Sequence, residues 1–349
     1  MSPRVAALLL LLDAQPALAA EFRGGARLWA GAGVDTNARR DYTSPDVPTQ
    51  PDGFFFGLLH LQGVSLFAET VRVAGTYDLA GRKFLTLATE DTLVQDGSLE
   101  AAVGIARSVE VGVLGRVRDR RGAERNYTDL TGGVLVDFLP TDALDVRLTF
   151  GAHRFLYWER FEYSYYGPEG VASIRYRFTR RHSLSVFGSF IPRTYNAAAR
   201  PPPDVMPVPD AQVRFDSYFT VGAGYSYRGP FHLSVGYAYF DQSSNSYGES
   251  IRRHRVSVTG GFQLPWELTL LTALTAQFSA FPQGVYLSPD LTVVEDDENA
   301  SSLTVKLVRP IIKYVELDLR YAGYLNFLPQ NSFLYLRHVI SLGLAVAIP

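Results

Sequence analysis

Apolar and polar residues alternate along most of this chain with a period of two. In the segment from Leu144 to Phe155, leucine, valine and phenylalanine fall on one face of an extended strand, and Asp145, Arg147 and His153 fall on the other. The segments 171–178 and 254–262 repeat the split. A face with two charges in one strand does not fit a dry core. The pattern therefore predicts strands with one apolar and one wet face.

Very short turns and longer polar connections alternate between these segments. The expected strands span residues 22–36, 54–67, 70–84, 92–106, 109–119, 127–138, 143–157, 162–178, 182–194, 212–228, 231–243, 251–264, 267–280, 301–309, 313–327 and 333–348. The expected short turns lie at Glu69, 107–108, 140–142, 179–181, 229–230, 265–266 and 310–312. This organisation is typical of an all-β, transmembrane, antiparallel up-and-down β-barrel of about sixteen strands, with short turns in the periplasm. A large soluble β-sandwich fits less well, because no linker or composition break divides the chain.

The N-terminus predicts an exported protein. Residues 1–20 combine Arg4, an apolar run over 5–12 and an Ala-x-Ala site at 17–19, which is typical of a signal peptide. The expected domains are thus a signal peptide over 1–20 and a barrel over 21–349. There is no cysteine in the chain, which fits an oxidising compartment and excludes a lipoprotein. We expect the protein in the outer membrane of a Gram-negative bacterium.

Two short motifs add to this interpretation. The C-terminal strand carries Ser341, Gly343, Val346 and Ile348, which resemble the terminal pattern read by the barrel-assembly machinery, although Pro349 stands where an aromatic residue is more usual. The first strand and its exit, residues 31–42, contain a G-x-D-T-N-x-x-R run. This run resembles the opening of several porin-like barrels, including those that accompany exopolysaccharide export. The resemblance implies polysaccharide secretion as one candidate function.

Charge patterning suggests what the barrel could pass. The chain has 33 basic and 35 acidic residues, and the resulting net charge of −2 gives no case for nucleic-acid binding. The candidate pore-lining residues are Arg116, Arg118, Arg147, Arg175, Arg177, Arg214, Arg253, Arg255, Asp145, Glu316 and Asp318. The basic excess on the wet face favours anions. The alternative is that these charges pair across neighbouring strands and only keep the wall wet.

Catalysis has little support in the sequence. Among the six histidines, His60, His153 and His232 are expected on the wet face, and His254 and His338 on the lipid face. None has a spacing that links it to a nucleophile. Metal-ligand motifs and phosphate-binding glycine motifs are also missing. We therefore expect no enzyme activity, no cofactor and no metal site.

The sequence thus predicts an outer-membrane channel that passes small hydrophilic solutes, with anions preferred, by passive diffusion. The alternatives are a polysaccharide secretion conduit and a structural or adhesive surface barrel. Expected partners are outer-membrane lipid and lipopolysaccharide, the barrel-assembly machinery and, for the export alternative, a periplasmic partner at the short turns. Two long connections carry a Pro-rich segment within 196–211, which could constrict the lumen, and an acidic run over 295–298 suited to lipopolysaccharide through divalent cations.

Overall fold

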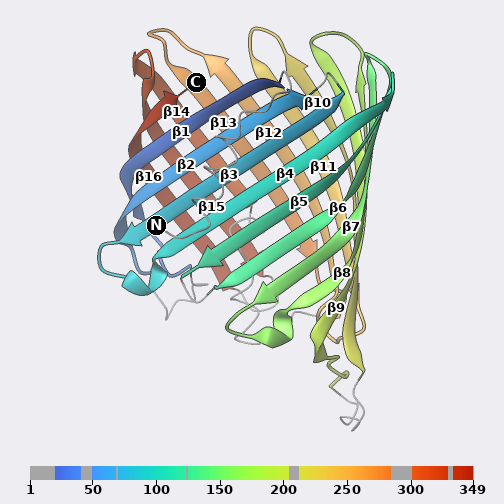
Figure 1. The fold of residues 1–349 in the computed structure, drawn as a ribbon. Helices are drawn as coiled ribbons and strands as arrows, with labels where there is room; N and C mark the ends of the chain where they lie inside the picture. The colour runs from blue at the N-terminus through green and yellow to red at the C-terminus, as the bar shows by residue number, and fades with distance from the viewer. Residues whose placement is uncertain are drawn as a thin grey trace.

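The chain forms one closed antiparallel barrel in which each strand pairs with its sequence neighbours and β1 pairs with β16 (Figure 1). The structure is a computed structural model that describes residues 20–40, 49–67, 70–122, 125–203, 212–283, 301–328 and 333–348. The sixteen strands in these ranges are β1 Ala20–Asp35, β2 Asp52–Phe67, β3 Val71–Phe84, β4 Thr92–Ala106, β5 Val109–Arg121, β6 Tyr127–Thr141, β7 Leu144–Tyr157, β8 Tyr165–Arg177, β9 His182–Ala198, β10 Val213–Arg228, β11 His232–Ser244, β12 Ile251–Gln263, β13 Thr269–Ala280, β14 Ser301–Ile312, β15 Val315–Leu328 and β16 Phe333–Ile348.

The predicted fold class and the predicted order of strands are confirmed. One turn is placed wrongly: residues 310–312 belong to β14, and the turn to β15 lies at Lys313 and Tyr314. A β-bulge between Pro310 and Ile312 explains the difference, because it lets the strand pass a residue that cannot donate a backbone hydrogen bond. Likewise β6 continues past Pro140 to Thr141 across an irregularity in its register. Four predicted features lie outside the described residues: residues 1–19 of the expected signal peptide, the turn at Glu69, residues 204–211 of the Pro-rich segment and the acidic run 295–298. The last residue of the expected signal peptide, Ala20, is the first residue of β1.

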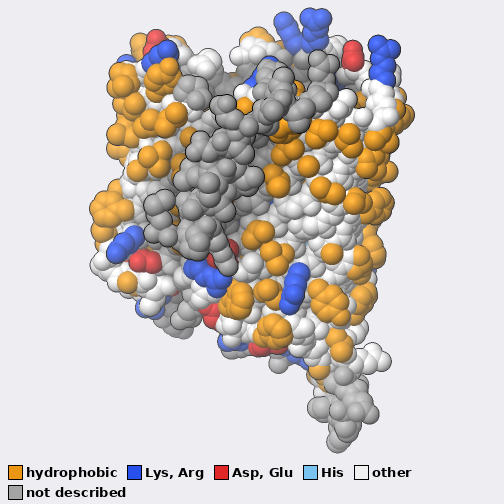
Figure 2. Space-filling view, viewed as in Figure 1, with side chains coloured by type: hydrophobic (Ala, Val, Ile, Leu, Met, Phe, Trp, Pro, Cys, Tyr) orange, Lys and Arg blue, Asp and Glu red, His pale blue; other side chains and the backbone are white. Residues whose placement is uncertain are grey.

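The outer face of the wall exposes apolar side chains that a soluble protein would bury. Phe150 is 60% exposed, Ile174 48% and Leu319 44%. Hydrophobic side chains spread over the visible outer surface, and charged side chains gather mostly toward the two ends (Figure 2). Large contiguous apolar surface of this kind marks contact with lipid rather than water. The barrel is therefore a transmembrane one. No helix in the described ranges is long and apolar enough to cross a membrane.

The two ends of the barrel differ. Short turns join β2 to β3, β4 to β5 and each later even strand to the next, and the C-terminal end of β16 lies at the same end, at the top of Figure 1. Longer connections leave the opposite end, where two single 3₁₀ turns, Ala88–Glu90 and Phe161–Tyr163, follow β3 and β7. The predicted alternation of short and long connections holds for most of the barrel. The exceptions are the β5–β6 connection, residues 122–126, and the β15–β16 connection, residues 329–332, which are no longer than the β12–β13 turn, residues 264–268. Which end faces the periplasm stays a prediction.

The first-strand motif closes the barrel at the β1–β16 seam. Arg337 of β16 donates to both carboxylate oxygens of Asp35 at 2.5–3.0 Å, and both side chains are almost fully buried. The buried Asn37 donates through its side chain to the Leu336 carbonyl at 3.3 Å. Thr36 exchanges two further hydrogen bonds, both 2.9 Å, with the backbone of His338. The conspicuous polar residues of this motif thus join the first and last strands.

Candidate functional site

The candidate site is the inner face of the wall. The strand registers place alternate residues of each strand on this face, as in the pairs Asp137 with Arg147 and Asp145 with Arg175. The inner face carries all eleven predicted pore-lining residues, namely Arg116, Arg118, Arg147, Arg175, Arg177, Arg214, Arg253, Arg255, Asp145, Glu316 and Asp318. Their effect on solutes remains a prediction.

Toward the short-turn end, inner charges form an ion-pair ladder across five strands. Glu100 of β4 accepts a hydrogen bond from Arg72 of β3 at 2.6 Å and also contacts Arg147 of β7. Arg147 lies 3.5 Å from Asp137 of β6, and Arg72 lies 3.5 Å from Glu110 of β5. These charges pair across neighbouring strands, as the wet-wall alternative expects. Because each positive charge of the ladder lies beside a negative one, the pairs cancel much of each other's electrostatic field.

Other predicted residues are paired as well. Arg116 binds Asp96 at 2.5 Å, and Arg118 lies 3.9 Å from the same carboxylate. Arg255 donates to Gln277 at 2.9 and 3.2 Å, so its partner is a neutral amide that leaves the positive charge uncompensated by this contact. The remaining contacts join Arg175 with Asp145 at 4.0 Å, Arg253 with Ser279 at 3.0 Å, Arg27 with Glu316, and Lys306 with Asp318.

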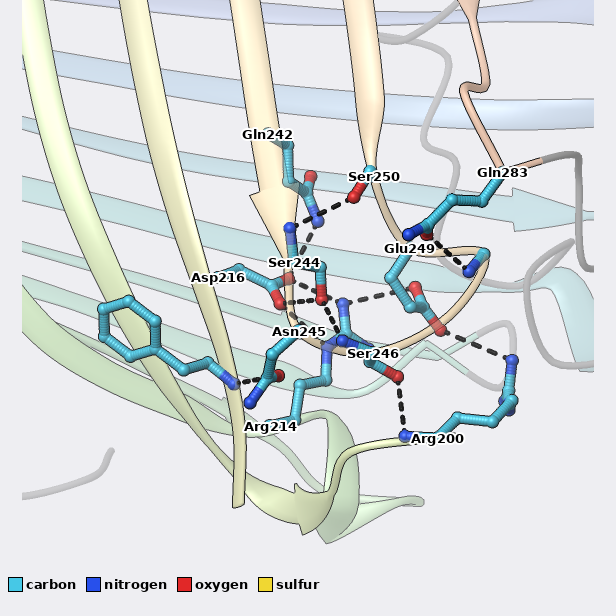
Figure 3. Close-up of polar contacts among 12 residues, drawn as sticks. Arg200, Arg214, Asp216, Gln242, Ser244, Asn245, Ser246, Glu249, Ser250 and Gln283 are labelled. Carbon is cyan, nitrogen blue, oxygen red and sulfur yellow. Dashed lines mark hydrogen bonds and ion pairs between the residues drawn. The ribbon is translucent and has the colours of Figure 1, made fainter. Parts of the chain in front are cut away.

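A polar network holds the rim at the long-loop end (Figure 3). Asp216 of β10 is fully buried and accepts hydrogen bonds from Arg214 at 2.7 and 3.2 Å, from Gln242 at 2.9 Å and from Ser244 at 2.5 Å. Arg214 also lies 3.2 Å from Glu249 in the β11–β12 connection. Arg214 lies on the inner side of β10 but is only 7% exposed, so it anchors this connection and presents little of its charge to the channel.

A basic vestibule opens at the short-turn end, with a volume of about 820 Å³. Its charged lining comprises Arg175, Arg177, Arg180, Arg181, Arg228 and Asp142, with His182 beside them. Serines from β9, β10 and β11 add hydroxyl groups. Arg177 donates to the main-chain carbonyl of Asp142 at 3.3 Å, a contact that leaves its positive charge in place. The sequence pattern missed Arg180 and Arg181, because residues in turns have no place in a period of two. It also left out Arg228, although this last residue of β10 lies within an expected strand.

A second recess, of about 510 Å³, lies in the inner wall formed by β1–β5 and β14–β16. Aromatic residues Trp29, Phe54, Phe56 and Tyr324 line it together with a set of basic residues. The Arg27 guanidinium lies 4.3 Å from the centre of the Trp29 ring, and the Lys306 ammonium lies 5.1 Å from it. Trp29 thus faces the inner wall, although tryptophan in membrane proteins is enriched at the two membrane interfaces.

The histidines lie on the faces that alternation predicts. On the inner face, His60 contacts Asp78 at 2.7 Å and His153 contacts Asp129 at 2.6 Å. On the outer face, His254 and His338 form hydrogen bonds with tyrosines of adjacent strands. The second ring nitrogen of His60 faces an amide oxygen at 3.5 Å, not a hydroxyl nucleophile. Within the described residues, no group of three potential metal ligands comes together.

Comparisons with known proteins return similarity of architecture alone. No family model and no curated protein matches the sequence. Among solved structures, a bacterial polysaccharide outer membrane secretin has 10% identity and a TM-score of 0.47, with 93% of this chain and 98% of that chain covered. OccAB4 of Acinetobacter baumannii has 9% identity and a TM-score of 0.45, covering 94% and 98%. A mutant of the Rh. blastica porin has 10% identity and a TM-score of 0.41, covering 94% and 100%.

Proposed function

We propose that this chain forms a water-filled channel in the outer membrane through which small hydrophilic anions diffuse passively. A closed barrel with an apolar outer face and a charged inner face provides a wet path across a bilayer. A barrel of sixteen strands is wide enough to hold an aqueous channel. Selectivity in such a channel follows from the charged side chains that its solutes pass.

The observation that supports the anion preference is the excess of basic over acidic side chains in each of the two inner recesses. The vestibule is lined by five arginines and one aspartate. The second recess, in the wall formed by β1–β5 and β14–β16, is lined by six basic side chains and one aspartate. Anions therefore meet positive potential at the short-turn end and again farther along the wall. The ion-pair ladder between other strands contributes little to this field, because its opposite charges lie within 3.5 Å of each other.

The proposal is tested by the zero-current potential of the refolded protein in a planar bilayer under a salt gradient. Wild type should prefer chloride over potassium, and the preference should weaken at high salt through screening. Replacing Arg175, Arg177 and Arg181 by serine should lower the chloride preference below that of the wild type at the same salt concentration. Arg154→Ser on the outer face is the matched control, since Arg154 alternates with the inner residues of β7. Cation preference, or no change in the triple variant, would contradict the proposal.

The polysaccharide conduit remains the alternative, resting on the first-strand resemblance. In the structure the residues that carry this resemblance join β1 to β16, and this structural role accounts for Asp35, Thr36 and Asn37 without a passing polymer. No separate contact in the described wall favours it. A pore that stays closed at every voltage and salt concentration would nevertheless argue against diffusion and revive the conduit or the structural barrel.

A further inference from the structure

The second recess has a cluster of apolar side chains in its lining, here called its floor, which is unusual on a wet barrel face. Leu58 of β2, Ala80 of β3 and Val94 of β4 line it next to Phe56. Part of the nearby apolar surface has a structural explanation: a small core that includes Phe54, Ala322 and Val339 seats Ala38 and Leu87 of the long connections. Leu58 and Val94 are not members of that core, and Phe56 only packs against it while remaining partly exposed. Seating the connections therefore does not account for the floor.

Positive charge surrounds this floor. The basic side chains that line the recess are Arg40, Arg82, Arg118, Arg120, Lys306 and Arg320, and the acidic one is Asp318. Asp318 is engaged by Lys306. Arg82 and Arg337 both contact Asp35, and Arg116 and Arg118 both contact Asp96. In each of these two contacts, one carboxylate is shared by two guanidinium groups.

Arg320 is the most available of these cations. It projects from the inner face of β15 opposite Lys306 of β14 and is exposed to the lumen. Within the described parts of the chain, no carboxylate lies at ion-pair distance from it. A solute that reaches the recess thus meets an exposed guanidinium in a recess that Phe56 and Leu58 also line.

On the basis of the proposed anion channel, we infer that this recess is a binding subsite for a carboxylate attached to a six-membered ring with an apolar face. The carboxylate would bind the guanidinium of Arg320, which is suited to planar two-point contact. The ring would lie on Phe56 and Leu58, as in binding sites that combine an apolar surface with a few placed polar groups. Aromatic acids and sugar acids share this chemistry, whereas acetate has the charge without the ring.

Calorimetric titration of the full chain in detergent tests the inference with benzoate, galacturonate and acetate as ligands. At least one ring carboxylate should bind about tenfold tighter than acetate or more, because only it contacts both the charge and the apolar floor. Arg320→Ser should weaken the binding of that ring carboxylate about tenfold. Phe56→Ala should lower its affinity to nearly that of acetate. Controls are Arg154→Ser on the outer face of β7 and Phe187→Ala, an inner-face phenylalanine of β9 that does not line this recess. Both controls should bind as wild type does.

The outcomes separate the sources and the two proposals. Tight binding of benzoate alone identifies aromatic acids, and tight binding of galacturonate alone identifies sugar acids. The inference is overturned if neither ring acid binds tighter than acetate, or if Arg320→Ser and Phe56→Ala both bind as wild type. Arg320→Gln and Phe56→Leu replace any variant that fails to refold. Titration needs no current, so an anion-selective pore without ring-acid binding would leave the proposed function standing and reject only the subsite.

Discussion

At the scale of single residues, the inner and outer positions of one strand differ in solvent although they are adjacent in sequence. Phe150 faces outward near the middle of β7 and is 60% exposed, whereas Thr149 faces inward toward Leu135 of β6. Phe150→Arg should destabilise the barrel by about 2–4 kcal/mol, since it places a charge in lipid, and Thr149→Arg should cost much less. Equilibrium unfolding in urea from lipid vesicles would measure both. Equal costs on the two faces would argue for a soluble sandwich.

The seam offers a second residue-scale prediction. Arg337→Ala leaves the fully buried Asp35 without its bidentate partner, and loss of one member of a buried pair costs about 3–5 kcal/mol. The unfolding midpoint should therefore fall markedly. Arg320→Ala is the matched control on the neighbouring strand and should change stability by about 0.5 kcal/mol or less, because it removes an exposed side chain. Similar losses in the two variants would show that Asp35 and Arg337 do not hold the seam.

At the scale of elements, close approach of two strands depends on particular glycines. Gly151 of β7 pairs with Gly133 of β6, and a Cβ at Gly151 would lie 2.3 Å from the Gly132 carbonyl oxygen. Gly151→Ala must shift the β6–β7 backbone and should cost about 1–3 kcal/mol. At Gly115 of β5 the nearest atom to a new Cβ is 3.9 Å away, so Gly115→Ala should be tolerated. Urea unfolding of both variants checks this, and a tolerated Gly151→Ala would contradict the close packing.

Element-scale comparison also shows what the sequence could predict. A period of two identifies each strand and its wet face, and it placed the eleven charged candidates on the inner wall. It cannot identify their partners. Arg147 of β7 and Glu100 of β4 are separated by two strands, β5 and β6, and they meet only because of the strand registers of the closed barrel. Turn residues such as Arg180 and Arg181 carry no periodic signal.

At the scale of the whole molecule, the alternation of short and long connections predicts orientation. The turn at 229–230 should lie in the periplasm and the connection after β9 outside the cell, as short turns do in bacterial barrels. An epitope tag inserted after Pro203 should be reached by antibody on intact cells. The same tag between Gly229 and Pro230 should be reached only after the outer membrane is permeabilised. The reverse labelling would invert the topology.

The wall of the barrel has lipid on one face and water on the other, and a cysteine scan of one strand tests this most directly. The chain contains no cysteine, so each single-cysteine variant has one reactive thiol. Residues 145–153 of β7 can be scanned in membranes with a bulky, charged maleimide that dissolves only in water. We expect labelling at Asp145, Arg147, Thr149 and His153 and protection at Val146, Leu148, Phe150 and Ala152. Uniform protection, or labelling without a period of two, would contradict a water-filled channel.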